Sequence, residues 1–230
     1  MKSLFSFGLR LGYIALNVAA VLRIPRIKDR LAERIINETS VHAMLHEADR
    51  AFKAAGAGDA GRLAARDLVM LRLLYASGGR VSEICGLTWA GCVARANGQG
   101  QVTLFGKGDK TRMVLLSSAT WAALDTLRSD NTAAAPVFSS RKGGGHLSTV
   151  QVWRIIRTAA KRAGLAAAVS PHFMRHAHAS HAIDRGAPLH TVQATLGHAS
   201  VATTGRYLHV RPEESSALVW GCDLGMLITQ

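Results

Sequence analysis

Five short fragments of the chain carry residue types that suit chemistry at a phosphate group. In chain order they are Gly78-Gly79-Arg80-Val81-Ser82-Glu83, Gly106-Lys107-Gly108, His172-Phe173-Met174-Arg175, Leu196-Gly197-His198 and Tyr207. A phosphodiester attacked by a side-chain oxygen passes through a transition state with extra negative charge on its non-bridging oxygens. Arginine matches that charge because its planar guanidinium stays protonated and donates two parallel hydrogen bonds. We therefore expect Arg80 and Arg175 to form a clamp, with His198 as a third donor.

Tyr207 is the candidate nucleophile. A phenol with an unperturbed pKa near 10 is ionised in only about one molecule in a thousand at pH 7. Three pKa units correspond to roughly 4 kcal/mol, which nearby cations could offset in a site that excludes water. Taken alone, a tyrosine near a helix end is more simply a packing residue, so the assignment depends on the arginines and histidines around it.

In this order and at this spacing, the five fragments resemble the tyrosine recombinase (phage integrase) family, in particular its Xer-like and integron-type members. The resemblance runs from about residue 3 to about residue 215 and implies the catalytic-domain fold of that family. It implies site-specific DNA recombination, in which the enzyme cuts and rejoins DNA through a 3′-phosphotyrosyl intermediate. Because such an ester conserves the energy of the broken bond, no ATP, metal or other cofactor is implied.

The resemblance also assigns a role to each residue. Lys107 is expected to protonate the leaving 5′ oxygen, His172 to take or give the tyrosine proton, and Glu83 to orient Arg80. The implied catalytic set is Arg80, Lys107, His172, Arg175, His198 and Tyr207.

The charge of the chain points to a polyanionic partner. Its 230 residues hold 28 Lys and Arg against 15 Asp and Glu, a formal net charge of +13. Such an excess favours nucleic acid first and an anionic membrane surface second. We expect double-stranded DNA as the partner, contacted by basic side chains from the linker, the hairpin and a later loop: Arg26, Lys28, Lys110, Arg112, Arg141 and Lys142.

Two features bear on the compartment. Cys85, Cys92 and Cys222 are too few and too scattered for a disulfide framework or a paired zinc motif, which favours a reducing, cytoplasmic location. The segment Leu4–Leu22 is mostly apolar, but Arg10 and Asn17 interrupt it and a basic stretch follows. We therefore expect a buried helix there and no membrane association.

Periodicity and stop signals predict a mainly α fold with a small antiparallel β-sheet. Helices are expected over 3–21, 39–54, 62–77, 81–87, 118–128, 149–163, 171–186, 189–196, 200–208 and 213–220. Thr39-Ser40, Ser148 and Ser170-Pro171 offer N-terminal caps. The β signal is a hairpin, in which 101–105 and 112–116 flank a glycine-rich loop.

The predicted domain organisation departs from the family pattern in its N-terminal part. Residues 1–24 correspond to only the last helix of the family's core-binding domain, 25–38 to a basic linker, and 39–230 to the catalytic domain. The chain is therefore expected to be a shortened member or a fragment, with DNA binding that is weaker and sensitive to salt. The tail over 213–230 resembles the segment that family members pack onto a neighbouring subunit, which implies a homo-oligomer on DNA, a tetramer in the synaptic complex, with a monomer possible in free form.

The sequence is compatible with two functions other than recombination. One is a non-catalytic or regulatory DNA-binding relative, favoured by the missing N-terminal helices. The other is a metal-dependent nuclease built on the histidines, because His172 and His176 lie four residues apart on one helical face, a spacing that zinc sites use. Against it, His178 and His181 fall roughly on the opposite face. His176, His178, His181 and His190 are more simply structural or DNA-facing.

Overall fold

The computed structural model describes residues 2–23, 35–106, 111–128, 132–141, 143–165, 169–197, 204–205 and 207. The chain divides into two compact units, Met1–Arg30 and Leu31–Gln230. In the part of the chain that the structure describes, no helix is both long and apolar enough to cross a membrane.

The N-terminal unit contains two short helical segments rather than one long helix. Helix α1 covers Lys2–Arg10 and a 3₁₀ turn, η1, covers Val18–Val21. The prediction of one helix over 3–21 is therefore wrong. Gly12 has a left-handed backbone with φ of +73°, which ends the α-helical path. Asn17 then caps η1, since its Oδ1 accepts a hydrogen bond from the Ala19 N–H at 3.1 Å.

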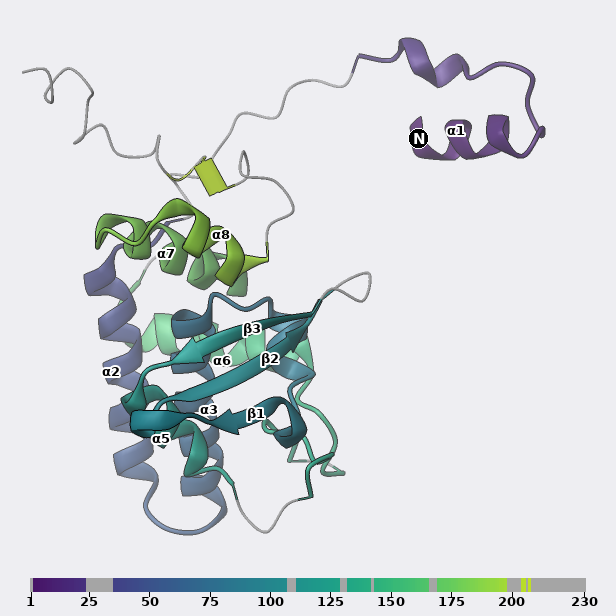
Figure 1. The fold of residues 1–230 in the computed structure, drawn as a ribbon. Helices are drawn as coiled ribbons and strands as arrows, with labels where there is room; N and C mark the ends of the chain where they lie inside the picture. Colours follow the sequence, from purple (N-terminus) through teal and green to yellow (C-terminus); the bar gives the residue numbers. More distant parts are fainter. Residues whose placement is uncertain are drawn as a thin grey trace, which may run out of the picture. The chain divides into compact units, whose positions relative to one another are not determined.

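The larger unit is built on seven α-helices among its described residues (Figure 1). They are α2 (Glu38–Ala55), α3 (Asp59–Ser77), α4 (Val81–Cys85), α5 (Ser118–Asp125), α6 (Thr149–Arg162), α7 (Pro171–Asp184) and α8 (Leu189–Leu196). The predicted helices from 39 to 196 are confirmed within a few residues. The cap of α2 is Asn37 rather than Thr39-Ser40, whereas Ser148 caps α6 as predicted. The helices predicted over 200–208 and 213–220 lie almost wholly outside the described residues.

Three antiparallel strands form one sheet, in the order β1-β2-β3. Strand β1 covers Cys92–Ala94, β2 covers Gly100–Phe105 and β3 covers Thr111–Leu116. The β2–β3 hairpin confirms the prediction, with Val102 opposite Val114. Strand β1 was not predicted, since three residues are too few to show a period of two. Two further 3₁₀ turns, η3 (Trp89–Gly91) and η4 (Ala96–Gly98), flank it.

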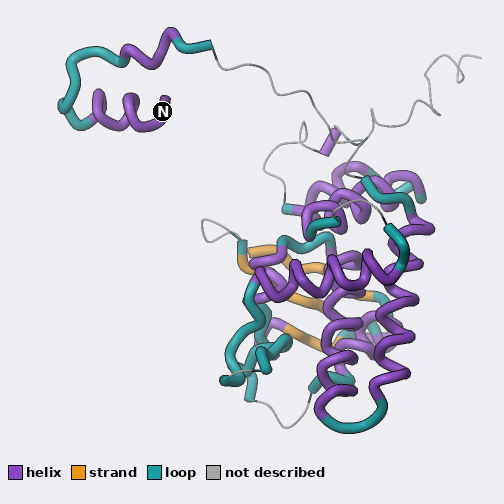
Figure 2. Tube along the Cα trace, turned by 180° about the vertical axis from the view of Figure 1, so that it is seen from behind, coloured by secondary structure: helices purple, strands orange, loops and turns teal. Residues whose placement is uncertain are grey.

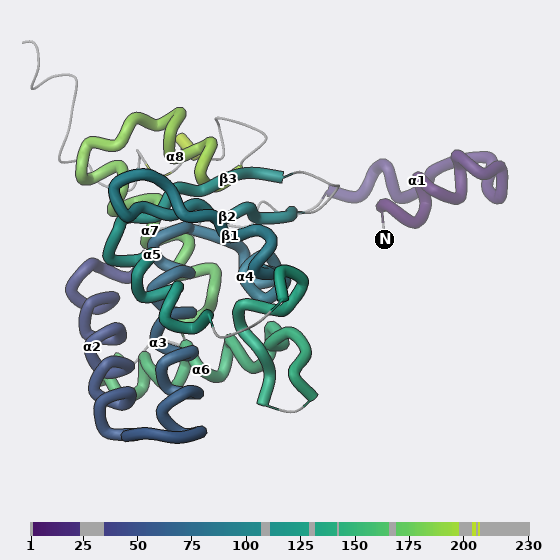
Figure 3. The backbone as a smooth tube through the Cα atoms, turned by 60° about the horizontal axis from the view of Figure 1, so that its bottom comes forward, coloured from purple at the N-terminus to yellow at the C-terminus, as the bar shows by residue number. Residues whose placement is uncertain are grey.

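The core lies between the helices and one face of the sheet. Helix α3 is its centre, with Leu68, Leu71 and Leu74 almost fully buried, and it packs against α2, α5 and α7. Seen from behind, the strands lie against the helices (Figure 2). Figure 3 shows α8 beside β3, two segments far apart in sequence that contact each other. This packing brings the end of α3, the start of α7, the end of α8 and strand β3 to one region.

Candidate functional site

Helix α3 ends in a glycine turn that leads directly to Arg80. Gly78 is left-handed with φ of +56°, and a Cβ there would lie 2.6 Å from Cδ2 of His178. Only glycine fits this position without strain. Arg80 begins α4 as its N-cap, and both its backbone N–H and its Nη1 donate to Glu83, at 2.7 and 2.8 Å. The expectation that Glu83 orients Arg80 agrees with these contacts.

Glu83 is the centre of an ionic network. Its side chain is 1% exposed and accepts two further hydrogen bonds from Arg112, at 2.8 and 2.7 Å. Burial by itself would raise the pKa of Glu83, but hydrogen bonds from Arg112 and Arg80 outweigh it and lower the pKa to about 2. The carboxylate is therefore charged at neutral pH and holds two guanidinium groups in place.

Arg112 occupies a different place from the one expected for a DNA-binding residue. Its side chain is 11% exposed, its two terminal nitrogens bond Glu83, and its Nε donates to the carbonyl of Thr195 at 2.6 Å. A guanidinium with these partners has little surface left for a phosphate. The physical reason is alternation along β3, whose side chains at 112, 114 and 116 face the protein while Met113 and Leu115 face outward. The structure therefore supports a positioning role for Arg112.

Arg175 is buried between two backbone carbonyls. Its Nη1 donates to Gly78 at 2.6 Å and its Nη2 to Leu196 at 2.7 Å, and only 6% of the residue is exposed. Burial, with the charges of Arg80 and Arg112, lowers the pKa of Arg175 to about 10. The group therefore stays protonated at neutral pH. It ties the turn before Arg80 to the end of α8.

Tyr207 lies next to this cluster. It is 6% exposed, and its hydroxyl lies 2.6 Å from Nδ1 of His176, the residue that follows Arg175 on α7. The two rings have centroids 5.8 Å apart. Because His176 directly follows Arg175 on α7, its contact with Tyr207 brings two expected site residues, Arg175 and Tyr207, close together.

The other predicted residues divide into two groups. His172 is exposed in the first turn of α7 and has no hydrogen-bond partner among the described residues, and Arg141 is exposed beside Arg62 and Arg66 in a cleft of about 560 Å³. The remaining candidates lie outside the described residues: Arg26, Lys28, Lys107, Lys110, Lys142 and His198.

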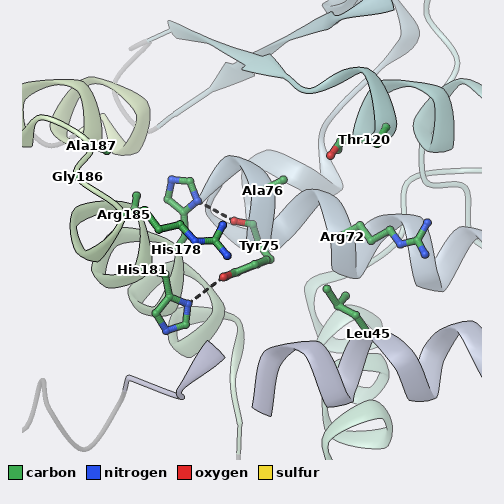
Figure 4. A pocket seen from close by; sticks show the side chains of 12 residues that line it. Leu45, Arg72, Tyr75, Ala76, Thr120, His178, His181, Arg185, Gly186 and Ala187 are labelled. Atoms are coloured by element: carbon green, nitrogen blue, oxygen red, sulfur yellow. Dashed lines mark hydrogen bonds between the residues drawn. The ribbon is translucent and has the colours of Figure 1, made fainter. Parts of the chain in front are cut away.

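Two histidines of α7 have structural partners in a cavity of about 810 Å³ (Figure 4). Nδ1 of His178 lies 2.8 Å from the Tyr75 carbonyl, and Nδ1 of His181 lies 2.9 Å from the Tyr75 hydroxyl. Burial lowers the pKa of His178 to about 4, which keeps it neutral. Among the described residues, no three His, Cys, Asp or Glu side chains form a group that could hold a metal ion.

Arg112 and His176 make contacts that were not predicted from the sequence. Arg112 was expected on a DNA-facing surface, and His176 was expected to be structural or DNA-facing. The alternation of β3 does indicate the inward direction of Arg112, because it puts position 112 on the same face of the strand as buried Val114. No such pattern indicates the contact of His176, because its partner lies 31 residues away.

Comparison with known proteins agrees with this arrangement. Residues 34–214 match the phage integrase family. Over 211 residues the chain is 36% identical to tyrosine recombinase XerC of Xylella fastidiosa (strain 9a5c), covering 91% of this chain and 67% of that protein. The chain belongs to the phage integrase family. It is also 34% identical to tyrosine recombinase XerD of Mycobacterium leprae (strain TN), covering 90% of this chain and 66% of that protein.

Solved recombinase structures share the fold. The chain matches the XerH site-specific recombinase bound to its difH substrate with a TM-score of 0.65 at 23% identity, over 81% of this chain and 52% of that chain. It matches the XerA recombinase with a TM-score of 0.63 at 24% identity, over 95% of this chain and 71% of that one. The chain therefore spans about half of XerH and about two thirds of the XerC and XerD relatives.

Proposed function

We propose that this chain is the catalytic part of a site-specific DNA recombinase that cuts and rejoins double-stranded DNA through a phosphotyrosyl ester on Tyr207. The observation that carries the proposal is the convergence of Arg80, Arg175 and Tyr207, which come from three distant stretches. Chemistry on DNA implies a cytoplasmic location.

Arg80 supplies open hydrogen-bond donors for a pentacoordinate phosphate, and Arg175, whose two terminal nitrogens already donate to backbone carbonyls, supplies positive charge near them. Among the described residues, only Nη1 of the Arg80 guanidinium has a hydrogen-bond partner, so Nε and Nη2 are available for a non-bridging oxygen. Arg175 lies close enough to Arg80 and Arg112 for their charges to lower its pKa, which means that positive charge is concentrated before any substrate binds. A bound phosphate anion relieves the repulsion between these arginines. The relief is strongest in the transition state, where the negative charge of the phosphate is greatest.

The covalent step exchanges one phosphoester bond for another. The Tyr207 oxygen attacks phosphorus as its proton passes to His172, and the bond from phosphorus to the 5′ oxygen breaks. Lys107 gives its proton to that oxygen, and His198 donates a hydrogen bond to the phosphate. The exposure of His172 in the first turn of α7 supports access to the DNA, while the roles of Lys107 and His198 follow the family resemblance. Rejoining reverses each transfer, so neither ATP nor a metal ion is needed.

The partner and assembly follow the same reasoning. The net charge of +13 favours DNA, and the solved relatives include XerH bound to difH and a lambda integrase dimer bound to a COC′ core site. We propose that 39–230 forms the catalytic domain, 25–38 a basic linker and 1–24 the last part of a core-binding domain. Copies assemble on DNA, as a tetramer at synapsis, through the tail over 213–230.

The test uses a nicked duplex that carries the recombination site from the gene's neighbourhood. The nick lets the short cleaved product diffuse away and traps the protein on a 3′ phosphate. Tyr207→Phe abolishes the adduct and leaves DNA binding intact, whereas Tyr13→Phe, at an 81% exposed residue of the N-terminal unit, is the matched control and retains the adduct.

Two results separate the alternatives, and a third tests Lys107. Binding with no adduct would select the non-catalytic relative. Activity lost to a chelator would select the metal-dependent nuclease. A bridging 5′-sulfur substrate tests Lys107, because sulfur leaves without a proton: Lys107→Ala is rescued on it if Lys107 is the acid.

A further inference from the structure

Two consecutive residues of α7 hold opposite parts of the site. Arg175 fastens the phosphate-binding part, through the carbonyls of Gly78 and Leu196. His176 faces the nucleophile, with Nδ1 2.6 Å from the Tyr207 hydroxyl. The role of Arg175 is accounted for by the proposed chemistry, while that of His176 is not.

The ring of Tyr207 lies in a small apolar cluster between α7 and α8. Its buried neighbours there are Ala179, Val192 and Leu196, and 6% of Tyr207 is exposed. A nucleophile must come within van der Waals contact of the phosphorus of a DNA strand, which is too bulky to enter such a cluster. The hydroxyl therefore has to leave His176 before it can attack.

We propose that His176 is a positioning residue that anchors the Tyr207 hydroxyl in a buried resting arrangement, and that cleavage begins when this hydrogen bond breaks. The inference rests on the proposed function, in which Tyr207 is the nucleophile. The hydrogen bond between His176 and Tyr207 is partly buried, and such a bond is worth about 1 kcal/mol net, a factor of about five in the population of the released tyrosine. This hydrogen bond, the anchor, therefore sets the fraction of molecules in which Tyr207 is free to reach the phosphate. It takes no part in the chemical step, which other groups carry out.

Nitration with tetranitromethane, read by mass spectrometry of peptides, tests the anchor in the free protein. The chain has three tyrosines, so two serve as internal standards: Tyr13 is 81% exposed, and Tyr75 bonds His181. We expect Tyr207 to react much more slowly than Tyr13 in the unmodified protein. His176→Ala should speed nitration of Tyr207 about five-fold, with Tyr13 and Tyr75 unchanged.

Two variants make the result specific to the hydrogen bond. In His176→Asn the amide oxygen can occupy the place of Nδ1, so this variant should keep Tyr207 protected. His190→Ala removes an exposed histidine of α8 and should change nothing. Unaltered nitration of Tyr207 in His176→Ala, or equal rates for Tyr207 and Tyr13 in the unmodified protein, would overturn the anchor.

Cleavage of the nicked duplex separates the anchor from a role in the chemistry. Under the proposal, His176→Ala forms the adduct as fast as the unmodified protein or up to about five-fold faster. A hundred-fold loss would make His176 part of the reacting set and reject the resting role. If the unmodified protein forms no adduct on any recombination site, the proposed function fails, and nitration still decides whether the anchor exists.

Discussion

The phosphate-binding part of the site and the nucleophile are held in place by very different means. Glu83 receives four hydrogen bonds from Arg80 and Arg112, and Arg175 bridges two backbone carbonyls, so the cations are fixed by several buried, charge-assisted contacts. Tyr207 is a neutral side chain whose hydroxyl meets His176 and whose ring lies in a small apolar cluster.

This difference divides the work of catalysis between the two parts. Electrostatic stabilisation of a transition state is strongest when the charges need no rearrangement at the moment of reaction. A nucleophile, in contrast, is useful only when it reaches the phosphate at the right time. A rigid cation network beside a tyrosine held by neutral contacts meets both needs.

The largest effect is expected at Arg175. Arg175→Gln removes a cation and leaves the Gly78 and Leu196 carbonyls without their donors, so adduct formation should fall at least about 10³-fold. Arg175→Lys should also be impaired, because one ammonium group cannot bridge both carbonyls in the same geometry. Single-turnover cleavage measures the loss. If Arg175→Gln forms the adduct at a rate within ten-fold of the unmodified protein, Arg175 does not contribute to the cation network.

Arg112 comes next. Arg112→Met leaves buried Glu83 with one of its two cationic partners, so the free energy of unfolding should fall by about 3–5 kcal/mol, with cleavage lost as well. The matched control is Arg141→Met, at an exposed arginine, which should leave stability unchanged and lower the salt dependence of DNA binding by about one unit of slope. Denaturant titration and binding isotherms distinguish the two. If the Arg112→Met protein is as stable as the unmodified protein and only binds DNA less well, Arg112 is a DNA-binding residue and not a positioning residue.

The pH dependence of the free energy of unfolding should show the contribution of the ionised Glu83 carboxylate. Because folding lowers the pKa of Glu83 from 4.5 to about 2, the carboxylate stabilises the folded state above pH 4.5, and this contribution is lost as the pH falls toward 2. Its size is up to about 3 kcal/mol. Glu83→Gln should therefore be less stable than the unmodified protein at pH 7, with a difference that shrinks below pH 4.5.

Glu47→Gln, on α2, breaks a surface pair with Arg50 and should change unfolding by less than about 1 kcal/mol. Urea titrations at pH 7, 4.5 and 3 provide the measurement. A constant difference between the unmodified protein and Glu83→Gln at all three values would contradict the ionised carboxylate.

The smallest effect is expected at the turn before Arg80. Gly78→Ala places a Cβ against His178 and Leu196 in a left-handed backbone, which should cost about 1–3 kcal/mol. For a protein of this size each kcal/mol lowers Tm by about 2–4 °C. Thermal melting gives the value. Gly143→Ala, in an open left-handed loop with no atom near its Cβ, shows the cost of the backbone alone.

Much of the fold was predictable, because it depends on local signals. The helices over 62–77 and 189–196 follow from apolar spacing and from glycines at their ends, and the β2–β3 hairpin from alternation around a glycine-rich loop. The N-terminal prediction failed because one left-handed glycine and one capping asparagine, each compatible with several structures, outweighed an apolar stretch. Strand β1 has only three residues, too few to show an alternating pattern, and its pairing with β2 is what defines it as a strand.

The amino-acid sequence was sufficient to identify the groups that could act on a phosphate: the cationic fragments, their order and the tyrosine that follows them. Local rules and a family resemblance suffice for this, because residue types and spacing carry that information. The direction in which each cation points depends on long-range packing. Arg112 is committed to Glu83 and the Thr195 carbonyl, and the Tyr207 hydroxyl meets His176. These pairings join residues from 29 to 83 positions apart, and chain topology, not any neighbouring residue, brings them within hydrogen-bond distance.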